Sequence, residues 1–151
     1  MSTGYKKFKT HILGHKVEKS SIIIAGATTK PMFTVSSGRV CITALVGEVA
    51  TTAIGANASN LSVNSDPTVG LTGVLGAAVA MASAAVGTTF SITGNPGAAM
   101  IKNTGVALTC TQPCIVPAGA ITLTTSGDNT GQMKWTLWYW PVDPDASVTV
   151  T

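Results

Sequence analysis

The stretch GQMKWTLWYWPV, residues 131–142, decides the fold because it joins the strongest strand signal in the chain to half of its aromatic side chains. It holds all three tryptophans and one of the two tyrosines. Successive side chains of a β-strand point to opposite faces. The pattern therefore predicts one face with Trp135, Leu137 and Tyr139, and an opposite face with Thr136, Trp138 and Trp140.

Both faces of this strand carry large aromatic side chains. One face is expected to fill the core, and the other needs a cover, because such a patch rarely stays exposed on a monomer. Burying two tryptophans removes on the order of 200 Å² each from water, which amounts to several kcal/mol at about 25 cal/mol per Å². Trp138 and Trp140 are therefore candidates for a subunit interface. The alternative is a strand buried on both faces within one chain.

Outward from this strand, short apolar runs alternate with turn residues at a spacing of roughly eight to twelve residues, which is typical of a sandwich or barrel. Charged residues make up 10% of the 151 residues, and threonine is the commonest residue with 23 copies. This composition excludes a disordered chain and a coiled coil. We expect an all-β, single-domain β-sandwich of jelly-roll type over residues 20–151, preceded by an extended basic N-terminal arm over residues 1–19.

The Ala- and Gly-rich segment 69–87 lies within a longer stretch, residues 67–101, that carries no charge. Its length would permit a membrane span. Recurring glycines and hydroxyls, and the lack of flanking basic clusters, argue against one, so no membrane is expected. Alanine favours a helix and the glycines weaken it, which leaves helix, loop and strand open.

The net charge of +3 arises near the N-terminus. The five lysines of the arm are Lys6, Lys7, Lys9, Lys16 and Lys19. A basic arm can contact an acidic protein surface or nucleic acid, and the alternative is a solvated terminus. The remaining basic residues are scattered along the sequence, so direct nucleic-acid binding is not expected.

No group of residues has the pattern of a catalytic or metal site. His11 and His15 lack a third ligand, and no histidine follows them that could activate a serine. Asp143 and Asp145 flank Pro144, a pattern more typical of a turn that ends a strand. We therefore expect a non-enzymatic protein without a cofactor or metal. A disulfide between Cys110 and Cys114 is geometrically possible, and free thiols are the alternative we favour.

Two segments resemble small β-rich structural proteins of tailed bacteriophages, either capsid decoration or minor tail proteins. The first comprises VEKSS at 17–21, FTV at 33–35 and GRVCITALVGEV at 38–49, and the second is GQMKWTLWYWPVD at 131–143. The family's closing strand has the form KWxLxYxPLD, and this chain departs from it at Val142, where the pattern has leucine. The resemblance covers about half of the chain.

The resemblance implies a structural protein of the virion, assembled in the host cytoplasm, and a homo-oligomer, with a trimer favoured because related decoration proteins are often trimers. It implies that the lysine arm contacts the major capsid protein or other virion proteins, so that the protein binds and stabilises the head shell. A tail, tail-fibre or head-fibre component is the alternative within this class. A carbohydrate-binding module, with Trp138 and Trp140 stacking on sugar rings, is the alternative from another class.

Overall fold

The computed structural model describes residues 12–151, which form eleven β-strands in two antiparallel sheets. The strands are β1 (His15–Ile23), β2 (Thr28–Ser36), β3 (Val40–Val49), β4 (Asn60–Pro67), β5 (Gly73–Ala80), β6 (Thr88–Ser91), β7 (Ile101–Thr104), β8 (Cys114–Val116), β9 (Gly119–Thr125), β10 (Gln132–Pro141) and β11 (Ser147–Val150). The all-β prediction is confirmed.

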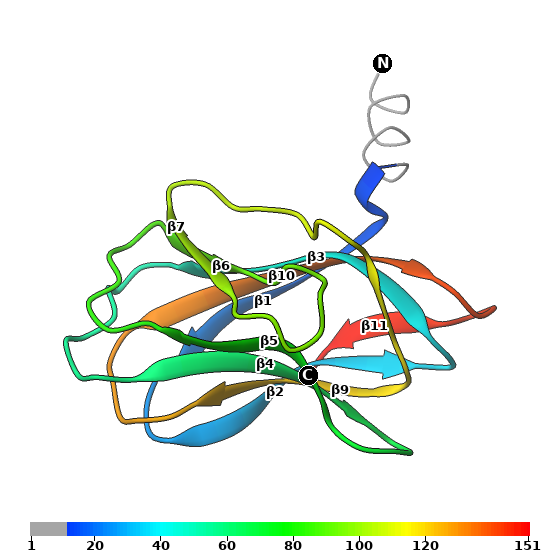
Figure 1. The fold of residues 1–151 in the computed structure, drawn as a ribbon, viewed down its shortest axis with the longest axis horizontal. Helices are drawn as coiled ribbons and strands as arrows, with labels where there is room; N and C mark the ends of the chain where they lie inside the picture. Colours follow the sequence, from blue (N-terminus) through cyan, green and yellow to red (C-terminus); the bar gives the residue numbers. More distant parts are fainter. Residues whose placement is uncertain (1–11) are drawn as a thin grey trace.

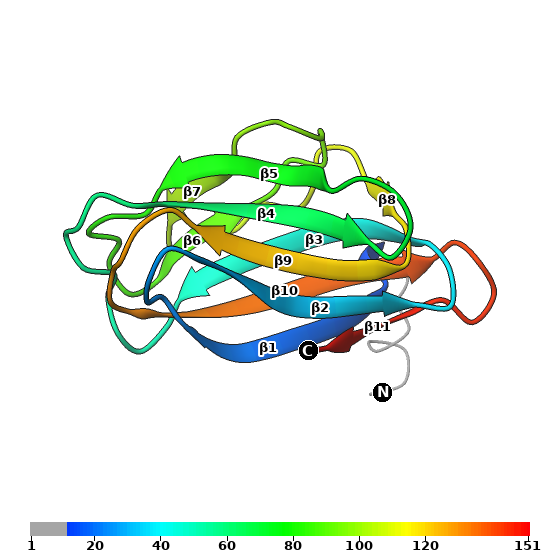
Figure 2. The ribbon, with the colours of Figure 1, turned by 90° about the horizontal axis from the view of Figure 1, so that it is seen from below.

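The two sheets face each other as a sandwich (Figure 1). The first sheet has the order β1-β10-β3-β6-β7, with β8 also paired to β3, and the second has the order β11-β2-β9-β4-β5. Figure 2 shows the second sheet lying across the first. Strands β1 to β4 alternate between the two sheets. The later strand β10 lies between β1 and β3 in the first sheet, and β9 lies between β2 and β4 in the second. Distant parts of the chain therefore become neighbours.

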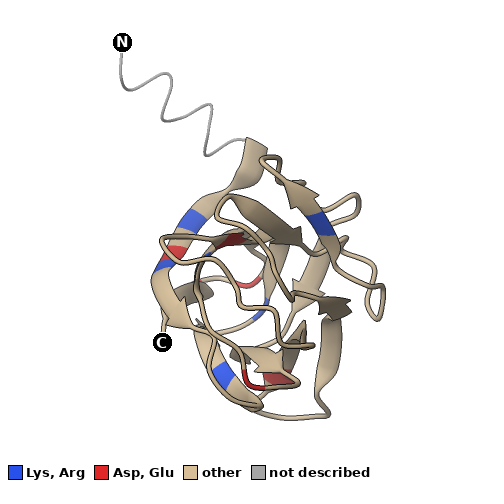
Figure 3. Cartoon of the chain, turned by 90° about the vertical axis from the view of Figure 1, so that its left-hand side faces the viewer, with Lys and Arg blue, Asp and Glu red and all other residues tan. Residues whose placement is uncertain are grey.

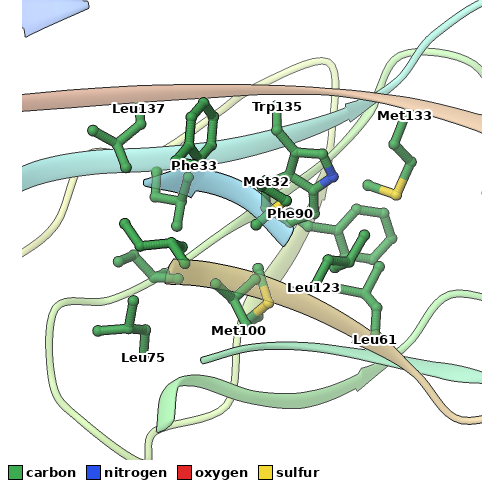
Figure 4. Close-up of a cluster of buried hydrophobic side chains, with 14 of the residues drawn as sticks. Met32, Phe33, Leu61, Leu75, Phe90, Met100, Leu123, Met133, Trp135 and Leu137 are labelled. Carbon is green, nitrogen blue, oxygen red and sulfur yellow. The ribbon is translucent and has the colours of Figure 1, made fainter. Parts of the chain in front are cut away.

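The inner side of β10 supplies much of the core, as its sequence pattern predicts. Trp135 and Leu137 are fully buried and Tyr139 is 7% exposed. Figure 4 shows Met133, Trp135 and Leu137 packed with side chains such as Phe33 from the opposite sheet. Trp138 and Trp140 are half-buried on the other side of the strand, so the predicted division of faces is correct.

The Trp135 ring fits into the core only because the neighbouring strand has no side chain beside it. Its residue neighbour in β3 is Gly47, and a Cβ atom there would lie only 2.6 Å from the Trp135 ring. The indole therefore occupies the space of a side chain at position 47. Gly47 is required here for close approach rather than for a special backbone angle.

The Ala- and Gly-rich segment contains a strand, β5, where the sequence leaves three alternatives open. Pairing decides the outcome, because β4 lies on one side of β5 and the segment 97–100 on the other. Ala77 donates its backbone N–H to Ala98 and accepts a hydrogen bond from Met100. Tertiary hydrogen bonds thus outweigh the helix preference of alanine. Within residues 12–151, no helix is long and apolar enough to cross a membrane.

The predicted boundary between the arm and the sandwich, at residue 19, lies inside β1. The prediction that the arm extends over residues 1–19 is therefore wrong at its C-terminal end. β1 pairs with β10 from His15 onward, with Lys16 opposite Trp138 and Lys19 opposite Trp135. The reason is the apolar side chain of Val17, which packs against the core between these polar neighbours. The sandwich thus begins by His15, and residues 1–11 lie outside the described part.

We predict that Gly47→Ala destabilises the protein by about 1–3 kcal/mol, because the added methyl overlaps the Trp135 ring. The measurement is the free energy of unfolding in urea, followed by tryptophan fluorescence. Gly73→Ala is the matched control, since it lies in β5 with nothing within 4 Å of the added Cβ. Equal unfolding midpoints for Gly47→Ala and the wild type would contradict the close contact.

Candidate functional site

The strand registers bring the beginning of the described chain to one end of the sandwich. His15 lies opposite Tyr139, and Val40 lies opposite Pro141. Gly119 lies opposite Val35 and Pro67 in the second sheet. We call this the His15 end, defined by residues 12–14, 37–39, 68–72, 117–118 and 142–146. In Figure 1 the chain joins the sandwich at this end.

A bulge in β3 fixes the segment that leads into β1. Trp138 pairs with Ala44 and Tyr139 with Ile42, so Thr43 is the extra residue of β3. The Thr43 hydroxyl lies 2.6 Å from the backbone oxygen of Leu13 and 3.2 Å from that of Trp138. One side chain thereby holds the incoming chain against the end of β10.

Gly14 and His15 complete this attachment. Gly14 has a φ of +87°, and a Cβ atom there would lie 2.1 Å from the backbone oxygen of Tyr139, so only glycine fits. The His15 ring lies 5.5 Å from the Tyr139 ring and 6.2 Å from the Trp140 ring, measured between centroids. The described chain therefore enters β1 beside Tyr139 and Trp140.

The two tryptophans lie on the outer side of the first sheet. We call the outer side of β10 and β3, with Ala44, Val46, Trp138 and Trp140, the tryptophan face. Ala44 is buried, and the other three side chains are half-buried. These four side chains form an apolar patch, which lies next to the point where the described chain enters β1. The same outer side continues through Thr136 to the Lys134–Glu48 pair, and Lys16 lies opposite Trp138 in β1.

A crossing segment, residues 105–113, borders the tryptophan face. Ser91 accepts a hydrogen bond from the Leu108 backbone at 3.2 Å, and Cys110 donates its backbone N–H to Thr43. These bonds close the sheet surface over Ser91, which is fully buried. Residues 107–110 belong to this connection and join no strand. Leu108 remains 39% exposed and extends the apolar surface.

The two lysines of the predicted arm that the structure describes are already engaged within the sandwich. The Lys16 ammonium lies 3.1 Å from the Glu18 carboxylate, and this hydrogen bond lowers the pKa of Glu18 below its ordinary value. Lys19 donates to the backbone oxygen of Thr151. Lys6, Lys7 and Lys9 lie outside the described residues.

Charge on the described body is balanced. Three of the nine basic residues belong to residues 1–11, and the six others are matched by the six acidic residues of the chain. Figure 3 shows the charged positions as separate bands rather than as one basic face. The net charge of +3 is thus carried by Lys6, Lys7 and Lys9.

The three cysteines, Cys41, Cys110 and Cys114, are free thiols. Burial raises the pKa of Cys110 to about 12 and also raises the pKa of Cys114. These two side chains pack against the core as small apolar groups. Among residues 12–151, no group of three or more His, Cys, Asp or Glu side chains is placed to hold a metal ion. His11 lies outside this range, and the His15 ring packs beside the Tyr139 and Trp140 rings.

Arg39 and Asp143 hold two turns of the His15 end together. The Arg39 guanidinium donates two hydrogen bonds to the Asp143 carboxylate, at 2.7 and 2.9 Å, and its backbone N–H donates a third at 2.8 Å. The predicted turn at Asp143 is thus present. Its partner Arg39 could not be predicted from a local pattern, because 104 residues separate the two.

No protein-family model matches the chain, and the search of the curated proteins finds no match. Among solved structures, the chain is similar to the structure of infectious bursal disease virus Gx strain, at 11% identity and a TM-score of 0.26. The match covers 90% of this chain and 39% of that one. Similarity at this level carries no argument about fold or function.

We predict that Asp143→Asn lowers Tm at neutral pH, and that its Tm approaches that of the wild type in acid. Hydrogen bonding to Arg39 lowers the pKa of Asp143 from 3.8 to about 2 in the folded protein. A carboxyl group with a lowered pKa stabilises the fold above its unfolded pKa, and the effect is lost as the pH falls to the folded pKa. The difference in Tm should therefore shrink between pH values of about 4 and about 2.

The measurement is Tm by circular dichroism across this pH range. In an Arg39→Gln background the pH-dependent part of the difference should become smaller, because the main cause of the lowered pKa is gone. If Arg39→Gln leaves that part unchanged, the ion pair is not its origin.

Proposed function

We propose that the protein is a non-enzymatic structural component of a virion, and that it is a capsid decoration protein that binds and stabilises the head shell. The observation that carries this proposal is the tryptophan face, a partly exposed apolar surface beside the point where a lysine-rich segment joins a neutral sandwich. An apolar contact surface next to a basic segment suits a protein that acts by assembling with others. The sequence resemblance to phage decoration and tail proteins supports the same class.

The strand order supports a jelly roll, the finer form of the fold. Without β7, β8 and β11, the two sheets have the orders β1-β10-β3-β6 and β2-β9-β4-β5. Four strands in each sheet, with most chain neighbours divided between the sheets and β4 and β5 paired in one of them, are what two interlocked Greek keys produce. This architecture occurs in viral capsid and lectin domains, so it is compatible with the virion role without selecting it.

The tryptophan face supports a homo-oligomer, with a trimer as the proposed form. Trp138 and Trp140 are only half-covered by the chain itself, and Val46 and Leu108 surround them with further apolar surface. Aromatic side chains are enriched at subunit interfaces because they bury a large area with few rotatable bonds. A second subunit packed on this face would bury the parts of Trp138 and Trp140 that the chain itself leaves exposed.

Antibody-gold labelling of virus particles, viewed by electron microscopy, tests the location. Label on the head surface is the expected result for a decoration protein. Label on the tail or on fibres would replace the decoration role by a tail, tail-fibre or head-fibre role. Absence of label from particles that contain other virion proteins would refute the virion role altogether.

We predict that Trp138→Thr reduces the molar mass of the purified protein from that of an oligomer to that of a monomer, because it removes one of the two largest apolar side chains of the proposed interface. The measurement is size-exclusion chromatography with light scattering, at several protein concentrations. Val86→Thr is the control: Val86 is 56% exposed in the β5–β6 connection, away from the tryptophan face. Circular dichroism checks that both variants fold.

A wild-type protein that is already monomeric would contradict the proposed interface. If its tryptophan fluorescence also changes on titration with glycans, the carbohydrate-binding alternative explains Trp138 and Trp140 instead.

A further inference from the structure

A pocket of about 270 Å³ lies at one edge of the sandwich, between β1 of the first sheet and β2 of the second. Its lining consists of Lys19, Ser21, Ile22, Ile23, Lys30 and Pro31. The edge strands β1 and β11 are in contact on this side of the molecule (Figure 2). β11 pairs with β2 only over residues 33–36, so the earlier half of β2 extends beyond the end of β11. The pocket thus lies where the strand that closes this edge ends.

Both strands that border the pocket are irregular beside it. The register of β1 with β10 shifts between Lys19 and Ile22, and the register of β2 with β9 shifts between Pro31 and Phe33. Bulges of this kind at sheet edges redirect side chains and are common next to functional sites. Two independent irregularities therefore occur at one place in the seam between the sheets.

The two lysines of the pocket lie on the inner sides of their sheets. Lys19 is opposite Trp135 in β10, and Lys30 is opposite Leu123 in β9. Trp135 and Leu123 are buried core residues, and directly opposite residues of paired strands point to the same face. A sequence that served packing alone would have apolar side chains at both positions. Instead, two partly buried side chains bring their charges to the seam between the sheets.

These two charges have no acidic side chain as an ion-pair partner among residues 12–151. The Lys30 ammonium donates a hydrogen bond to the neutral backbone oxygen of Ile23 at 2.8 Å, and the Lys19 ammonium donates to the backbone oxygen of Thr151. An ammonium group has three N–H donors, so each lysine retains donors for a ligand. An anion bound between two like charges would lower their electrostatic energy.

The four other Lys and Arg side chains of residues 12–151 differ from these two. Three lie beside an acidic residue and one lies over an aromatic ring: Lys16 with Glu18, Arg39 with Asp143, Lys134 with Glu48 and Lys102 with Phe90. The two cations of the described body that lack such a partner are therefore the two that line one pocket.

We infer that this pocket binds a carboxylate carried on a short aliphatic chain. The ammonium groups of Lys19 and Lys30 hold the carboxylate, and the Ser21 hydroxyl offers a further donor. The alkyl part contacts Pro31 and Ile23, which is 57% exposed in the empty pocket. Inorganic phosphate is a poorer fit, because its oxygens need more donors than this partly aliphatic lining supplies. The inference goes beyond the virion role and does not depend on it.

The test is a titration of the purified full chain with hexanoate, followed by proton–nitrogen correlation NMR. Saturable shifts of the backbone amides of Ile22 and Ile23 are expected, and uncharged hexanamide should cause none. Lys19→Met and Lys30→Met keep an apolar stem and remove the charge, so each should raise the Kd about tenfold. Lys102→Met is the matched control, because it removes the same charge from β7, at the opposite edge of the first sheet from β1. It should bind hexanoate as the wild type does.

Hexanoate represents two sources of the same chemistry, a free small acid and a carboxylate side chain of another protein. A peptide with blocked ends and a glutamate as its single charge distinguishes them. Saturable binding of this peptide, lost in Lys30→Met, would support the pocket and assign it to a protein carboxylate. Binding of hexanoate without binding of the peptide would support the pocket and assign it to a free acid.

Three outcomes would overturn the inference. The first is the lack of a saturable shift of the pocket amides in the wild type. The second is an equal response to hexanamide, which would leave an apolar contact without a role for the lysines. The third concerns edge protection, since inward-pointing charges also discourage pairing between sheet edges. If Lys19→Met and Lys30→Met fold by circular dichroism, bind hexanoate as the wild type does and self-associate in light scattering, the lysines protect the edge instead.

Discussion

The contact between Trp135 and Gly47 is the constraint on which the rest of the structure depends. β10 lies between β1 and β3, and the buried indole can lie flat against β3 only where that strand has no side chain. The indole nitrogen is buried and has no hydrogen-bond partner among the described residues. Leaving a donor without a partner costs free energy, and the large area that the ring buries offsets this cost. At this position, the apolar area that the ring buries contributes more to stability than a hydrogen bond of the indole nitrogen would.

The same strand connects the core to the proposed interface. Because side chains alternate along β10, the register that buries Trp135 and Leu137 also places Trp138 on the outside. The Thr43 bulge then joins this strand to Leu13, so the segment that precedes β1 begins at a fixed place. Core packing, the tryptophan face and the attachment of the lysine-rich segment therefore form one connected unit rather than three separate features.

Only part of the candidate site could be predicted from the sequence. Strand alternation was enough to separate Trp135 from Trp138, because that rule is local. Lysine density suggested an arm through residue 19, but Lys16 and Lys19 belong to β1, whose pairing with β10 spans more than a hundred residues. A run of charges does not reveal whether the apolar residue between them, here Val17, finds a core to pack against.

The sequence by itself determined the all-β class, the two faces of β10 and the concentration of net charge near the N-terminus, because each follows from composition or from a two-residue period. Tertiary structure decided the rest. It made a strand of Gly73–Ala80 by supplying backbone partners on both sides, and it joined Arg39 to Asp143 across two turns. It also placed the start of β1 beside the end of β10, where the Thr43 side chain holds Leu13. These features depend on which strands become neighbours, and non-local hydrogen bonding and packing settle that choice without any signal in a local stretch of residues.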